Sequence, residues 1–84
     1  MKHEEMAKLK KWYISELDKL YERLAKVKTL DECGKISEAF DIIEDKVRNT
    51  DPELFMQLQE ERHRFNVALD GRIEFLGGPK APRF

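Results

Sequence analysis

Three amphipathic segments, separated by two short stretches that carry helix-start signals, account for most of this 84-residue sequence. In the first segment, apolar residues recur every three or four positions, which is the spacing of one face of an α-helix. Neither Gly nor Pro interrupts this stripe, so we expect a helix over about residues 4–27. The stripe consists of Met6, Leu9, Tyr13, Leu17, Leu20, Leu24 and Val27.

The second segment begins at a capping box, in which a Thr and a Glu three positions later satisfy each other's backbone amides. Thr29 and Glu32 form this pair, and we expect a helix over about residues 31–48 after it. Cys33, at its start, is predicted to be a small core residue rather than a reactive thiol. The apolar stripe is Cys33, Ile36, Phe40, Ile43 and Val47, with Ala39 and Ile42 beside it.

The third segment follows a second capping box, formed by Thr50 and Glu53. Pro52 falls in the first turn, where its missing N–H costs nothing. The pattern then continues to the Gly77-Gly78 pair, which predicts one continuous helix over residues 51–76. Its apolar residues are Leu54, Phe55, Leu58, Phe65, Leu69, Ile73 and Leu76.

Short breaks between three helices favour a fold in which each helix returns along the previous one. We therefore expect an all-α, three-helix up-down-up bundle over residues 1–76, with long first and third helices, and an extended tail over 77–84. The middle helix is the shortest of the three, so some apolar stripe on the outer helices should remain uncovered at one end. That overhang suggests self-association or partner binding.

Composition narrows the class of function. No apolar run approaches the roughly 18 residues of a membrane span, and the single cysteine cannot form an internal disulfide, so we expect a cytoplasmic protein. The chain has only two histidines, His3 and His63, and no Gly-rich loop before a helix. Its Cys and His residues also lack the spacing of metal ligands. We therefore predict no enzymatic activity, no cofactor and no metal.

Basic residues surround the only Trp of the chain. Residues 1–28 carry eight Lys/Arg against five Asp/Glu, whereas residues 29–50 carry three against six. At about 100° per residue, one sector of the first helix collects Lys8, Trp12, Lys19, Arg23 and Lys26, which we call the basic face. If Trp12 is exposed, it is a candidate interface anchor, because Trp is favoured at binding hot spots. The alternative is that Trp12 packs against the end of the third helix.

The charged block "EERHR", residues 60–64, is divided by helical geometry. Glu61 and Arg62 border the apolar stripe, where we expect their aliphatic stems to cover the core and Arg62 to pair with the acidic second helix. His63 lies on the opposite side of the helix, together with Met56 and Val67. These last three residues, which we call the back face, are too apolar as a group for a purely solvated surface. They form a second candidate contact surface.

Two stretches resemble the small haemolysin-expression-modulating proteins, the Hha/YmoA family. They are "RLAKVKTLD", residues 23–31, and "TDPELFMQLQEERHR", residues 50–64, and the likeness covers about half the chain. The resemblance implies an all-α protein without enzymatic activity that binds the dimerisation region of the nucleoid protein H-NS. Arg62 stands where the family has an Asp that matters for that partner, and the segment between the two stretches is longer here.

Taken together, these features predict a small non-catalytic helical module that binds a larger protein. The basic face or the back face would supply the preformed surface. A self-assembling helical subunit, for instance a homodimer, is one alternative. A regulator associated with nucleic acid is another, although the net charge of −1 argues against it, because phosphate-binding domains are usually basic.

Overall fold

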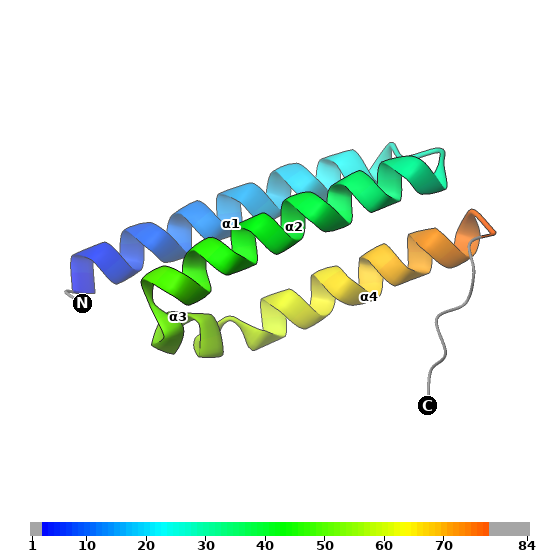
Figure 1. Cartoon of the computed structure of the whole chain (residues 1–84). Helices are drawn as coiled ribbons and strands as arrows, with labels where there is room; N and C mark the ends of the chain where they lie inside the picture. Colours follow the sequence, from blue (N-terminus) through cyan, green and yellow to red (C-terminus); the bar gives the residue numbers. More distant parts are fainter. Residues whose placement is uncertain (1–2, 78–84) are drawn as a thin grey trace, which may run out of the picture.

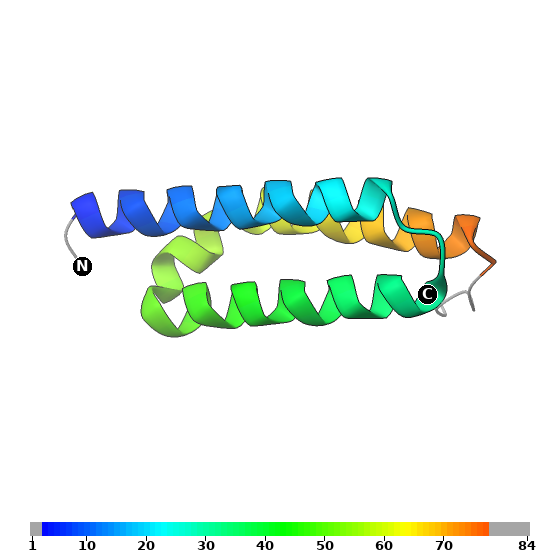
Figure 2. The same ribbon diagram turned by 90° about the horizontal axis from the view of Figure 1, so that it is seen from above.

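The computed structural model describes residues 3–77, and these residues form four helices without a β-strand. They are α1 (His3–Ala25), α2 (Leu30–Thr50), α3 (Pro52–Gln57) and α4 (Gln59–Phe75). Helix α2 returns antiparallel to α1, and α4 runs back in the direction of α1, with the short α3 at the turn between them (Figure 1). Seen from above, α1 lies over α4, with α2 beside them (Figure 2). The prediction of an all-α fold is confirmed.

The core lies between the helices and follows the predicted stripes closely. All four helices contribute buried apolar side chains, and two buried aromatic rings pack together within it, with the more exposed Tyr21 against one of them. Phe65 of α4 packs against Phe40 of α2 at 4.5 Å and edge-on against Tyr21 of α1 at 5.1 Å between ring centroids. The fully buried positions are Tyr13, Leu17, Leu20, Leu24, Val27, Cys33, Ile36, Phe40, Ile43, Val47, Leu54, Leu58, Phe65 and Leu69.

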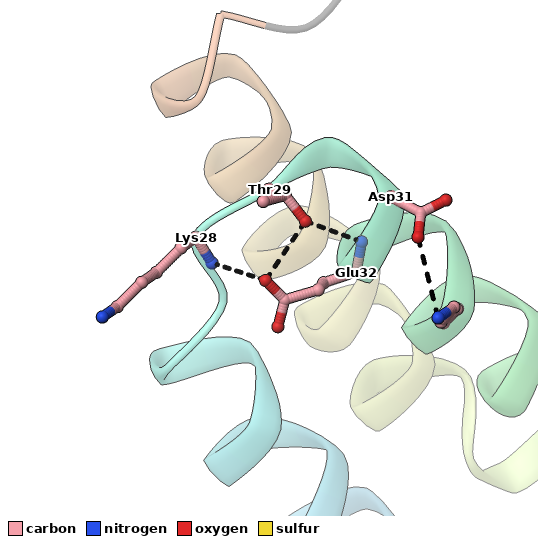
Figure 3. A network of polar contacts seen from close by, with 5 residues as sticks. Lys28, Thr29, Asp31 and Glu32 are labelled. Atoms are coloured by element: carbon pink, nitrogen blue, oxygen red, sulfur yellow. Dashed lines mark hydrogen bonds and ion pairs between the residues drawn. The ribbon is translucent and has the colours of Figure 1, made fainter.

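The turn between α1 and α2 is fixed by the predicted capping pair (Figure 3). The Thr29 Oγ1 accepts a hydrogen bond from the Glu32 amide at 3.2 Å. The Glu32 carboxylate in turn accepts from the Thr29 hydroxyl at 3.1 Å and from the Lys28 amide at 3.3 Å. The return bond thus reaches the hydroxyl and the preceding amide, rather than the Thr29 amide that a standard capping box uses.

The second turn is capped one residue later than the sequence indicates. Helix α2 continues through Thr50, and Asp51 becomes the N-cap of α3, where its Oδ1 accepts from the Leu54 amide at 3.2 Å. Pro52 occupies the first turn of α3, as predicted. An Asp caps a helix as well as a Thr does, so the cap can move along the chain without losing its hydrogen bond.

The predicted continuous helix over 51–76 is wrong, because α3 and α4 are separated at Leu58. The Leu58 amide is shared between the carbonyls of Leu54 and Phe55, which marks the irregular turn. Just beyond the break, the Arg62 guanidinium pairs with Glu44 of α2 and lies 4.0 Å from the centre of the Phe55 ring. The expected pairing of Arg62 with the second helix is therefore confirmed. These contacts are made across helices, so they hold the break in place.

The predicted length mismatch is also wrong in detail. Helix α2 has 21 residues against 23 in α1, and the shortest of the three long helices is α4 with 17. Helix α4 ends at Phe75, followed by Gly77 with a φ of +79°, a conformation that favours glycine. The rest of the predicted tail, residues 78–84, lies outside the described residues. None of the helices within residues 3–77 is both long enough and apolar enough to cross a membrane.

Candidate protein-binding site

The basic face is present on α1, and its four cations are exposed. Lys8, Lys19 and Arg23 of α1 are exposed, and so is Lys26 in the turn that follows the helix. Lys19 forms an ion pair with Glu16, one turn earlier, at 2.9 Å. Such exposed pairs contribute little to folding free energy, so these cations are not needed to hold the bundle together.

Trp12 is not the fully exposed anchor that the sequence offered as one alternative. It is partly buried and packs against the core from the side of α1 that faces α2. The Lys46 ammonium of α2 lies 4.5 Å from the centre of the indole ring. A cation at that distance over a Trp face is attracted by the ring's negative electrostatic surface. Trp12 therefore forms part of the contact between α1 and α2.

Helix α2 supplies a second half of this surface that the sequence analysis missed. Lys35, Ala39, Ile42 and Lys46 lie at helical spacing along the edge of α2 that faces α1. Ile42 is 70% exposed, although its position beside the apolar stripe suggested a contribution to the core. It lines a shallow depression with Ala39 of α2 and with Arg23 of α1.

We call the surface between these two helices the α1–α2 groove. Its floor is apolar, and its six cations come from both helices. Leu20, Ala39 and Ile42 line one depression along it with Lys19 and Arg23, and Lys26 and Lys35 line a second one together with Arg23. Beyond these depressions Lys46 lies over Trp12, and Lys8 is exposed on the same side of α1. Glu16 also lines the groove, paired with Lys19. A rigid apolar floor bordered by like charges is suited to binding a segment that carries apolar and acidic side chains.

The back face is less coherent than predicted. Met56 and Val67 are 65% and 55% exposed, and His63 is exposed as well. Met56 lies on α3, however, while His63 and Val67 lie on α4 beyond the break at Leu58. The neighbouring charges on α4 pair with one another, with Arg64 and Glu60 2.7 Å apart. The three residues are separate exposed side chains rather than a depression.

An apolar depression that the sequence did not indicate lies between α1 and α4. Tyr21 and Ala25 of α1 face Ala68 and Gly71 of α4 there, and Phe75 borders it with 78% of its surface exposed. Small side chains at facing positions leave this space open. The spacing of Ala68, Gly71 and Phe75 on one helix face would have been the only signal in the sequence.

The described residues offer few groups for chemistry. Burial raises the pKa of the Cys33 thiol, with the nearby Arg72 acting in the opposite direction, so the thiol stays protonated in the core. Residues 3–77 contain no group of three or more His, Cys, Asp or Glu side chains arranged to hold a metal ion. Among the surfaces described, the α1–α2 groove combines the most exposed charge with an accessible apolar floor.

Comparison of the chain with protein-family models, with curated proteins and with solved structures found no match. The resemblance to the haemolysin-expression-modulating proteins therefore stays a prediction. Any statement about function rests on the surfaces of the chain itself.

Proposed function

We propose that this protein is a small non-catalytic docking module that binds a larger cytoplasmic protein through the α1–α2 groove. The observation that carries the proposal is Ile42, an aliphatic side chain left 70% exposed in a depression that Lys19 and Arg23 also line. Exposed apolar side chains among charges are typical of interface centres, where burial on binding supplies affinity and the surrounding charges steer the encounter.

The architecture supports a rigid surface. In this proposal α3 and α4 act together as the third helix of an up-down-up bundle, and they hold the far sides of α1 and α2. The capped turn at Thr29 and the contact between Trp12 and Lys46 tie α1 to α2 at the two ends of the groove. A preformed surface loses little conformational entropy on binding, which favours affinity from a small area.

A matched pair of substitutions tests this proposal. Ile42→Ser and Val67→Ser each remove an exposed branched aliphatic side chain from mid-helix, one in the groove and one on the back face. With the tagged protein used for capture from an extract of its source cells, we expect Ile42→Ser to lower recovery of the bound protein at least tenfold and Val67→Ser to leave it unchanged. The reverse result would assign binding to the back face.

A nucleic-acid-associated regulator is the second candidate, and the row of cations on α1 favours it. Phosphate binding depends on charge alone, so reversing Lys8, Lys19 and Lys26 together should abolish it while Ile42→Ser leaves it intact. Titration of a labelled 20-base-pair duplex at 50 and 200 mM salt measures both effects. Under the docking proposal, the duplex binds no more tightly to the wild type than to the triple variant.

A further inference from the structure

Although six cations border the α1–α2 groove, its two outer edges carry opposite charges. Along α1 the outer rim is basic, with Lys19 on the helix and Lys26 in the turn that directly follows its end at Ala25. On α2, helical geometry places three exposed carboxylates, seven positions apart, on the side of Ile42 that points away from α1. These are Asp31, Glu38 and Asp45, and we call them the acidic rim.

The antiparallel register sets basic and acidic residues at matching levels. Trp12 lies opposite Lys46, and one depression is lined by Lys19 of α1 and Ala39 of α2. Closer to the turn, Lys26 shares a depression with Glu32. Glu38 directly precedes Ala39, so Lys19 lies at about the level of Glu38. Asp31 directly precedes Glu32, so Lys26 lies at about the level of Asp31. The two charged rows are therefore in phase along the groove.

A two-fold axis running along the groove makes this surface complementary to itself. Rotation about such an axis lays α1 of the second copy over α2 of the first copy, at the same level along the groove. In the same way, α2 of the second copy lies over α1 of the first. Each Lys19 then meets Glu38 of the other copy, and each Lys26 meets Asp31. Arg23 and Lys35 are brought together as like charges, and Asp31, 3.7 Å from Lys35 of its own chain, is shared between Lys35 and the approaching Lys26.

We infer that a second copy of this chain occupies the α1–α2 groove when the larger protein is absent, in a two-fold dimer. Ile42 and the edge of Trp12 would be covered at its centre. Two helices of this length bury roughly 600–700 Å² on each copy, at the low end for a specific interface, so the dimer should be weak and reversible. If the proposed function holds, self-association masks the docking surface and competes with the partner. This consequence, but not the dimer itself, rests on the proposed function.

Charge reversal at one matched pair provides the test. Lys19→Glu and Glu38→Lys alter exposed side chains on opposite rims. Each variant alone would place like charges together twice in the dimer, whereas an equimolar mixture, or both changes in one chain, restores opposite charges at every position. Lys10→Glu, an exposed residue of α1 outside the groove, is the control.

Sedimentation velocity in 50 mM salt, from 10 µM to 1 mM protein, measures the result. We expect the wild type and Lys10→Glu to dimerise, each single reversal to weaken dimerisation at least tenfold, and the mixture and the double variant to recover it. Circular dichroism confirms that each variant remains helical. A wild type that stays monomeric at 1 mM would overturn the inference, and so would a dimer that neither single reversal weakens.

Failure of this inference is distinguishable from failure of the proposed function. A monomeric wild type whose capture of the larger protein is lost in Ile42→Ser overturns the dimer and leaves docking in place. Conversely, a dimer that follows the charge-reversal pattern, with capture unaffected by Ile42→Ser, overturns docking and supports self-association as the role of the groove.

Discussion

The two sides of α1 are closed in different ways. Towards α4, Tyr21 packs edge-on against the buried Phe65, and small residues leave an apolar depression open beside this contact. Towards α2, the contact at the surface is a lysine over a half-buried Trp, with charged side chains on both rims. The first side is held by aromatic burial. The α2 side is held by the buried aliphatic residues between the two helices, and the surface above these residues is charged.

This difference separates stability from recognition on one helix. Buried aromatic area contributes several kilocalories per mole to folding, whereas exposed charges and half-buried edges contribute a fraction of that. Substitutions on the α4 side of α1 should therefore act on the fold, and substitutions on the α2 side should act on binding. Single substitutions on the two sides, followed by the free energy of unfolding, test that separation.

Phe65→Ala should have the largest effect. The Phe65 side chain is fully buried between Phe40 and Tyr21, so its loss leaves a cavity and should lower the free energy of unfolding by about 3–5 kcal/mol. Urea unfolding followed by circular dichroism measures the change. Since a small domain has little more stability than that, Phe65→Leu provides a milder variant with an expected loss of about 1–2 kcal/mol.

The control for the Phe65 substitution is a residue of α2, on the opposite side of α1 from α4. Ile42→Ser should change the free energy of unfolding by less than about 0.5 kcal/mol, because the side chain is largely exposed. If Ile42→Ser were as destabilising as Phe65→Leu, the α1–α2 groove would belong to the core, and the separation of stability from recognition would fail.

Much of the fold could be predicted from the sequence, because the helices follow from local patterns. The start of α2 is given by Thr29 and Glu32, and the core follows the apolar spacing on each helix. The break at Leu58 could not be predicted in this way, because Arg62 stabilises it through contacts with Glu44 and Phe55 on other helices. Only the gap in the apolar pattern between Leu58 and Phe65 hinted at it.

The sequence pattern indicated the α1 part of the candidate site but not the α2 part. Periodicity within α1 identified the basic face, because all five of its residues share one helix. It could not show which edge of α2 would lie beside that face, since this depends on the rotation of one helix against another. Ile42 illustrates the limit, because its position on the edge of the apolar stripe fits either a core residue or an exposed one.

Tyr13 lies between the two sides of α1, and its substitution should change the free energy of unfolding by an intermediate amount. Its buried hydroxyl has no hydrogen-bond partner among residues 3–77. Burial, reinforced by the Glu44 carboxylate, raises the pKa of Tyr13 well above its ordinary value of about 10. Tyr13→Phe removes an unsatisfied polar group, so it should raise the free energy of unfolding at pH 7 by about 1 kcal/mol.

The same substitution has a signature in pH. Above pH 10 the unfolded chain releases the Tyr13 proton while the folded chain retains it, so the folded protein loses stability as pH rises. Between pH 10 and 11, urea unfolding should show a loss about 1 kcal/mol larger in the wild type than in Tyr13→Phe. A smaller slope should persist in the variant, because burial also raises the pKa of Tyr21 and of Cys33. Equal slopes in the two proteins would place the Tyr13 hydroxyl in contact with water.

Lys46→Met should have the smallest effect on stability and the clearest optical one. The methionine keeps the apolar length of the side chain over Trp12 but removes the ammonium, so the loss should be about 0.5 kcal/mol or less. Trp12 is the only Trp of the chain, so its fluorescence reports this contact directly. Quenching by iodide, an anion that a nearby lysine attracts, should decrease in Lys46→Met and remain unchanged in Lys10→Met. Equal quenching in all three proteins would mean that Lys46 does not lie over the indole, and the α2 side of α1 would then lack the contact that distinguishes it from the α4 side.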